Sequence, residues 1–269
     1  MNSAQSTVSF VQLAVLTLMA PFTAASLAAC DSAEAPDHHT EITLLAAYTT
    51  GAADVAENIE AVIRKAIDDT NDAFKNSRIP LRLTLAGVDR VEYALTDRLQ
   101  DLRRLVRRDD GYLDDIHTLR NDLEADIVVL VVEDRGATIN AAVMADAATA
   151  FALVHYGTLG SPDFALAHEL GHLFGARHTP DSDPNPDPFQ FGHAFRNDSI
   201  KTIMSTGAQR VLPYFSGPDQ TYAGVVLGDS TLRNVAEVLR QTAVYISNFR
   251  GPEAPTDFVP TRTWPTISY

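Results

Sequence analysis

Apolar side chains between residues 41 and 132 recur with two different spacings. An apolar run at residues 42–48 predicts a strand, and the continuous apolar run at residues 126–132 predicts a strand covered on both faces. Leucine alternates with polar residues at positions 81–85, which is the pattern of a half-exposed strand. Apolar residues recur every three or four positions in further segments, which predicts helices: 54–75, 96–107 and 113–123. This order of elements predicts an α/β sheet with helical cover.

The next helical pattern, residues 164–174, combines an apolar side with two imidazoles and a carboxylate. His168 and His172 are four residues apart, so they fall one helical turn from each other and can bind a single ion about 2.0–2.1 Å away. Gly175 can adopt the left-handed conformation that ends a helix and turns the chain. We therefore expect the chain to return His178 to the same ion.

Three protein ligands leave the fourth position of a tetrahedral zinc ion open for water, which is typical of a catalytic site. Glu169 is adjacent to the first ligand and points beside the metal. That position suits a general base acting on a zinc-bound water. The sequence thus predicts one catalytic Zn²⁺ bound by His168, His172 and His178, with Glu169 as the catalytic residue.

Residues 168–178 resemble the signature of the metzincin zinc endopeptidases, whose second motif is a methionine-containing turn, here around Met204. Residues 213–218 resemble a segment of the bacterial reprolysin-like and peptidyl-Asp metalloendopeptidase families. The resemblance covers residues 44–250. It implies an α/β (α+β) catalytic domain with a twisted mixed sheet and an active-site helix, then a smaller C-terminal subdomain with the Met-turn and a final helix.

The resemblance also implies roles in substrate binding. Met204 would form an apolar floor under the imidazoles. Residues 207–218 would line the pocket for the side chain that follows the cleaved bond. There Arg210 could pair with an acidic substrate residue, which would give cleavage before Asp or Glu, or it could be a solvated surface residue. Tyr214 could reach the metal or form a wall of the pocket, and we favour the wall.

Two further elements flank the motif. Residues 151–156 predict a strand at the sheet edge beside the cleft, where an extended peptide could pair with unpaired backbone groups. The alternative is an ordinary edge strand shielded by a loop. After Asp229 or Ser230, apolar residues recur every three to four positions as far as Phe249, which predicts a last helix behind the active-site helix.

The loop at residues 180–188 is rich in proline and acidic residues. Its alternating Asp181, Asp183, Asn185 and Asp187 partly match a calcium-binding loop. However, Pro186 stands where that pattern needs Gly, and the bidentate Glu is missing. A solvated acidic loop is the favoured interpretation, and Ca²⁺ is the alternative.

The first thirty residues contain no charged side chain, and positions 10–29 are mostly apolar, which predicts an export signal at residues 1–30. The residues that end in Cys30 resemble the lipobox of bacterial lipoproteins. We expect a lipidated Cys30 that attaches the protein to a membrane of the cell envelope. A plain signal peptide and a periplasmic or extracellular protein are the alternative.

A net charge of −14 argues against nucleic acid as a partner, because no basic surface is available for phosphates. We expect a tether at residues 31–40, a zinc metallopeptidase domain at 41–250 and an irregular Pro-rich tail at 251–269. The predicted function is hydrolysis of internal peptide bonds in protein or peptide substrates. The alternatives are a non-catalytic zinc-containing envelope lipoprotein and a zinc amidase acting on cell-wall peptides. The sequence does not predict the oligomeric state.

Overall fold

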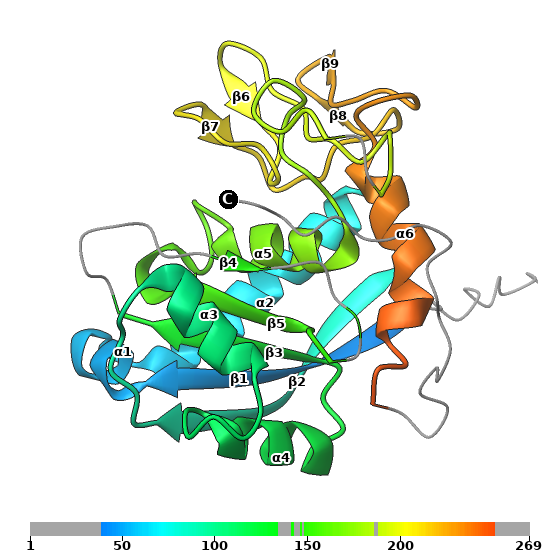
Figure 1. The fold of residues 1–269 in the computed structure, drawn as a ribbon. Coiled ribbons are helices and arrows are strands. Elements are labelled where there is room, and N and C mark those ends of the chain that lie inside the picture. Colours follow the sequence, from blue (N-terminus) through cyan, green and yellow to red (C-terminus); the bar gives the residue numbers. More distant parts are fainter. Residues whose placement is uncertain (1–38, 134–140, 143–145, 147, 186–187, 251–269) are drawn as a thin grey trace, which may run out of the picture. The chain divides into compact units, whose positions relative to one another are not determined.

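The computed structural model describes residues 39–133, 141–142, 146, 148–185 and 188–250 (Figure 1). The expected export signal, the lipidation site Cys30, most of the tether and the Pro-rich tail lie outside these residues. Among the helices that are described, none is long and apolar enough to cross a membrane.

A mixed sheet forms the first layer of the fold. Its strands are β1 (Thr40–Thr49), β2 (Leu81–Val91), β3 (Ile127–Val132), β4 (Ala141–Ala142) and β5 (Phe151–His155). They are ordered β2-β1-β3-β5-β4, and all neighbours are parallel except β4, which runs antiparallel to β5. The predicted α/β class with a mixed sheet is confirmed.

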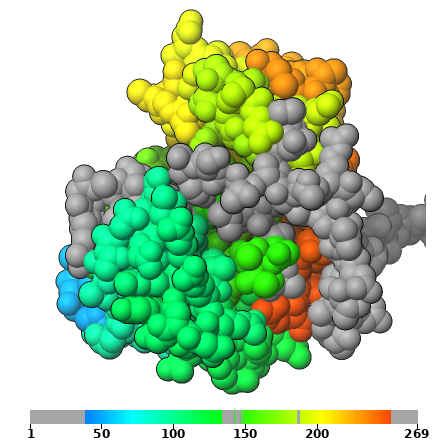
Figure 2. All heavy atoms as spheres, viewed as in Figure 1, coloured from blue at the N-terminus to red at the C-terminus, as the bar shows by residue number. Residues whose placement is uncertain are grey.

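Helices cover both faces of the sheet, and each face has its own apolar core. The helices are α1 (Thr50–Val55), α2 (Ile59–Asn76), α3 (Arg98–Val106), α4 (Asp114–Asp122), α5 (Ala165–Phe174) and α6 (Val235–Ile246). One core joins the sheet to α2, α5 and α6, and the other joins it to α3 and α4. In the space-filling view the green segment with α3 and α4 hides most of the blue β1 strand (Figure 2).

Alternation along the buried strands explains the two cores. In β3, Ile127, Val129 and Val131 contribute to the first core, whereas Val128, Leu130 and Val132 contribute to the second. Successive side chains of a strand point to opposite faces, so a strand buried on both faces must be apolar throughout. The continuous apolar run of the sequence therefore reflects a central strand.

The edge strand differs from the prediction. Residues 151–155 form β5, which lies between β3 and β4 and is buried at every position, and Tyr156 begins the short helix η1 (Tyr156–Thr158). The described sheet ends instead at β4. The prediction was wrong because a continuous apolar run indicates a covered strand, and because two alanines give no periodicity that would reveal β4.

Between α5 and α6 the chain forms short strands and loops on the side of α5 away from the sheet (Figure 1). Two small sheets form here, from β6 (Ile200–Lys201) with β7 (Arg210–Val211) and from β8 (Thr221–Tyr222) with β9 (Val225–Val226). Ile203, Met204 and Phe215 of this segment belong to the same apolar core as α5. Helix α5 therefore packs against the sheet on one side and against this segment on the other.

Candidate active site

The two ends of α5 fix where its side chains point. The helix begins after Phe164, which has φ 58°, and ends at Gly175, which has φ 98°. Ala176 donates to the carbonyl of Gly171 at 2.9 Å, so the chain turns back immediately. A residue with a Cβ is strained in this left-handed conformation, which explains the glycine. The turn brings His178 back to the helix, as the sequence predicts.

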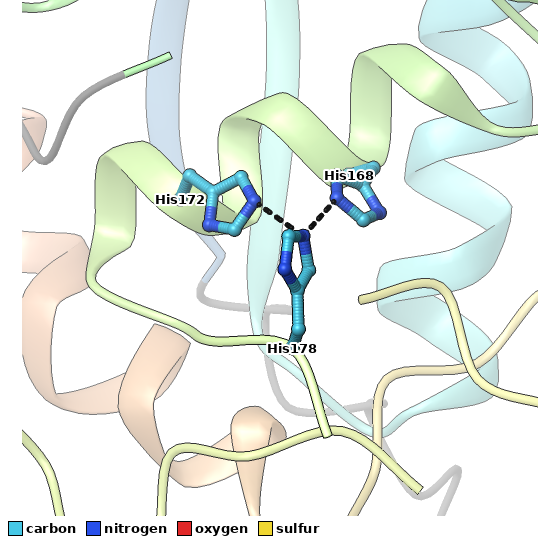
Figure 3. A group of neighbouring side chains, drawn as sticks. All are labelled: His168, His172 and His178. Atoms are coloured by element: carbon cyan, nitrogen blue, oxygen red, sulfur yellow. Dashed lines mark hydrogen bonds between the residues drawn. The ribbon is translucent and has the colours of Figure 1, made fainter. Parts of the chain in front are cut away.

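The imidazoles of His168, His172 and His178 meet at one point (Figure 3). The Nε2 atom of His178 lies 3.1 Å from the Nε2 atoms of both His168 and His172. Among the described residues, this is the one group of three or more His, Cys, Asp or Glu side chains close enough to bind an ion.

Hydrogen bonds on the far side of two rings decide which nitrogen faces the centre. His168 Nδ1 lies 2.7 Å from the carbonyl of Ile203, and His172 Nδ1 lies 3.0 Å from the carbonyl of Ala176. A carbonyl only accepts, so both Nδ1 atoms carry the proton and both Nε2 atoms present a lone pair.

One N–H on His178 satisfies at most one of the two lone pairs that face it, whereas a cation between the three nitrogen atoms attracts every lone pair. Tetrahedral zinc with bonds of about 2.0–2.1 Å separates its ligand nitrogens by about 3.3 Å. The spacing and the tautomers therefore fit a zinc ion held by these three histidines.

Burial keeps the three rings in the neutral form that binds metal. Burial, together with the neighbouring His178, lowers the pKa of His168 to about 4. Burial and the neighbouring imidazoles lower the pKa of His172 well below its usual value, and burial lowers that of His178 as well. Metal binding requires deprotonated imidazoles, so the site is prepared for an ion at neutral pH.

Glu169 is 5% exposed and lies on α5 beside the first ligand. Its carboxyl group makes no hydrogen bond or ion pair with the residues that the structure describes. Burial raises the pKa of Glu169 to about 8, and the charge of Arg98 opposes that rise. A buried carboxyl group with no partner beside metal ligands is suited to accept and release a proton.

Met204 is fully buried beneath α5. A methyl group at Gly171 would overlap the Met204 sulfur, so the helix and the turn approach each other at a position without a side chain. The residue before Met204 is Ile203, whose carbonyl accepts a hydrogen bond from His168 Nδ1. The Met-turn therefore supports the site through packing and through one backbone hydrogen bond.

One supporting residue is not among the predicted site residues. His193 is buried, and its Nδ1 atom lies 2.9 Å from the carbonyl of His178. Two backbone hydrogen bonds, from Arg177 to Gly192 and from Ala194 to Arg177, align this segment with the loop that carries His178. An isolated His fifteen residues beyond the third ligand has no spacing rule that would have identified it.

The two residues proposed for substrate binding lie in the predicted segment. Arg210 is exposed on β7 and donates to the Tyr222 hydroxyl at 2.8 Å. Its guanidinium carbon, Cζ, lies 5.2 Å from the centre of the Tyr222 ring. The Tyr214 carbonyl accepts from Ile203 at 3.0 Å. In this part of the structure neither side chain makes a hydrogen bond or ring contact with the three histidines.

The acidic loop is largely neutralised by arginines. Asp183 pairs with Arg177 at 2.7 Å, and Asp181 pairs with Arg196. Asp187 lies outside the described residues. Binding of Ca²⁺ to this loop stays the alternative to the favoured solvated acidic loop.

Comparisons with known proteins agree with this geometry. A reprolysin model of metallo-peptidase family M12 matches residues 38–216. The chain is 36% identical over 200 residues to a peptidyl-Asp metalloendopeptidase of Xanthomonas campestris pv. campestris, covering 72% of this chain and 48% of the relative. It is 33% identical over 218 residues to a peptidyl-Asp metalloendopeptidase of Stenotrophomonas maltophilia, covering 77% of this chain and 52% of the relative. The chain thus spans about half the length of the curated relatives it matches.

A solved structure of a chaperone-substrate complex contains a similar fold. The TM-score is 0.66 at 18% identity, over 80% of this chain and 40% of the other. This likeness concerns the fold alone.

Proposed function

Because the chain belongs to metallo-peptidase family M12, we propose that it is a zinc-dependent endopeptidase that hydrolyses internal bonds of extended polypeptides. The convergence of the three Nε2 atoms, with the buried Glu169 on the same helix, carries this proposal. The names of the curated relatives support it independently.

A zinc ion, when bound by His168, His172 and His178, polarises a substrate carbonyl and makes water more acidic. The protein residues then supply orientation and proton transfer. The carbonyls of Ile203 and Ala176 fix two of the rings, so the site does not need to rearrange when substrate binds.

Glu169 moves the proton in this mechanism. It takes a proton from the attacking water and gives it to the nitrogen of the leaving amine. Its raised pKa brings its proton affinity towards neutral pH, where a group can both accept and return a proton, and the charge of a bound ion favours the ionised base.

The substrate would lie against β4, where the described sheet ends. An extended peptide that pairs with an edge strand binds through backbone hydrogen bonds, so few of its side chains determine whether it is recognised. The relatives are named peptidyl-Asp metalloendopeptidases. We extend that preference to this chain as cleavage before an acidic residue.

Replacement of Glu169 tests the proposal. Glu169→Gln in the full chain keeps the shape of the side chain and removes the base, so about one zinc per chain should remain. Hydrolysis of a quenched random-peptide mixture should fall by roughly 10²–10⁴-fold or more. Metal analysis and fluorescence assays on parent and variant give the answer. Comparable hydrolysis by the variant would refute the role of Glu169, and zinc without hydrolysis in the parent would favour a zinc-binding envelope protein or a narrow-substrate amidase.

A further inference from the structure

Several cations lie around the three histidines, but most are already paired or exposed. Arg177 is buried and pairs with Asp183 at 2.7 Å. Arg98 is exposed at the start of α3. Lys201 differs from both because it is half-buried on β6 and has no carboxylate partner among the described residues.

The backbone around Lys201 connects it directly to the site. Its carbonyl accepts from Leu212 at 2.8 Å, so β6 is joined to the segment at residues 207–218, which we call the wall segment. Two residues later, Ile203 donates to the Tyr214 carbonyl of the wall segment and accepts from His168. Lys201 therefore lies on the short stretch that connects the first ligand to the wall segment.

Two charged side chains among the described residues act on Lys201, namely Asp163 and Arg196. Burial lowers the pKa of Lys201, while the charge of Asp163 raises it. Asp163 immediately precedes Phe164, so Lys201 lies towards the end of the site where α5 begins.

The ammonium group of Lys201 has more hydrogen-bond donors than the described residues accept from it. Within the described part of the chain it donates one hydrogen bond, to the carbonyl of Gly207 in the wall segment. An ammonium has three N–H donors, so two remain for an incoming group. A half-buried cation bonded only to a neutral carbonyl gains most from a carboxylate, because opposite charge compensates its partial loss of water.

The other candidates for an acid-binding position are weaker. Arg210 is exposed, and Tyr222 accepts one of its hydrogen bonds. A pocket of about 370 Å³ lies between α2, Phe164 and Pro213, but two aspartates and one lysine line it. Since Asp69 and Asp72 offset Lys75 there, that pocket offers an acidic side chain no net attraction.

We propose that Lys201 determines specificity by binding the carboxylate of the substrate residue that follows the cleaved bond. This inference rests on the proposed endopeptidase function. It replaces Arg210 in that role and limits the preferred substrates to peptides with Asp or Glu after the cut.

Two matched peptides that differ only in Asp or Asn after the cut test the proposal in the full chain. The parent should cleave the Asp peptide with the higher kcat/KM. Lys201→Met should lower kcat/KM for the Asp peptide by roughly 10- to 100-fold and change the Asn peptide by less than about threefold, as expected for loss of one charge-assisted contact. Lys201→Arg should keep most of the preference. Arg210→Met is the matched control and should leave the Asp to Asn ratio unchanged.

A charge reversal provides a second measurement. Lys201→Glu should improve cleavage of a third peptide, with Lys after the cut, relative to the Asp peptide. Zinc content and the unfolding midpoint of each variant show whether the fold is intact. The role of Lys201 would be overturned if Lys201→Met left the Asp to Asn ratio of kcat/KM unchanged, which includes an equal loss for both peptides. It would also be overturned if Arg210→Met abolished the preference for the Asp peptide. A parent that cleaves both peptides equally well overturns this inference alone, whereas a zinc-loaded parent that cleaves no peptide overturns the endopeptidase function.

Discussion

Gly171 and Met204 set how closely α5 approaches the turn beneath it. Met204 is fully buried, and its sulfur occupies the space that a side chain at Gly171 would need. Interiors are packed as densely as organic crystals, so one added methyl group forces a shift. The shift would reach His172, which follows Gly171 directly.

Replacement of both residues tests this packing. Gly171→Ala should lower the free energy of unfolding by about 1–3 kcal/mol through overpacking, and Met204→Ala by about 2–5 kcal/mol through a cavity. The double variant should lose less than the sum, because the new methyl group fills part of the cavity. Urea unfolding of all four proteins measures the coupling. Strict additivity would show that the two positions do not contact each other as described.

Single residues were predictable where a spacing rule applies. The positions of His168, Glu169, His172 and His178 follow from helical periodicity and from the turn at Gly175. The contacts of His193 and Lys201 were not predictable, because His193 contacts a carbonyl fifteen residues away and Lys201 one six residues away, and neither separation belongs to a helical or strand period. No periodicity encodes that kind of contact.

At the scale of elements, α4 packs on the sheet through polar residues as well as through the apolar Ile116. Arg120 is fully buried and donates to the backbone of Ala125 and Asp126. His117 is also buried, and its Nε2 atom lies 2.9 Å from the Arg107 carbonyl, so its Nδ1 atom is the unprotonated nitrogen. That Nδ1 atom meets no hydrogen-bond partner of normal geometry among the described residues.

Protonation of His117 should therefore destabilise the packing of α4. Burial lowers the pKa of His117, and the charges of Arg108 and Arg120 add to this effect. Below about pH 6.5 the unfolded chain binds a proton here that the folded chain does not, so stability falls as pH falls. The contribution is at most about 1.4 kcal/mol per pH unit.

His117→Gln removes the titrating group and keeps an N–H that can reach the Arg107 carbonyl. The zinc-loaded variant should lose less stability than the zinc-loaded parent between pH 7.5 and 5.5. Urea unfolding at both values measures the difference. An equal loss in both proteins would assign the pH dependence to other groups.

Elements with several turns or residues were predictable, whereas short strands were not. The apolar periods located α2, α3, α4 and α6 and the three long strands. Strand β4 and the pairs β6–β7 and β8–β9 have two residues each, which is too short for a period. Their positions depend on the partners they meet in the folded chain, and this is why the edge of the sheet was assigned to β5.

At the scale of the described fold, the metal site joins two layers. His168 and His172 come from α5, His178 comes from the loop after it, and Ile203 binds His168 from the segment beyond. An ion at this point therefore connects α5, which packs on the sheet, to the irregular segment that follows α5. Neither the strand order nor this crosslink is predictable from local patterns, and lipid attachment at Cys30 stays a prediction.

Removal of zinc should loosen the whole domain. Free zinc at about a thousand times its dissociation constant stabilises the folded state by about 4 kcal/mol, which corresponds to roughly 10 °C in the unfolding midpoint of a domain of this size. Thermal scans of the full chain with zinc and with a chelator should show that difference. His178→Ala is the control, because its midpoint should respond little to zinc. Identical midpoints for the parent in both conditions would contradict the crosslink.

The position of Met204 also bears on chemical damage. Its sulfur is enclosed between the turn and the backbone of α5 at Gly171, so a sulfoxide oxygen has no room there. Oxidation of a methionine turns an apolar side chain into a polar one. The intact fold therefore protects Met204 from peroxide, and a chain that carries sulfoxide at this position has first opened beneath its own metal ligands.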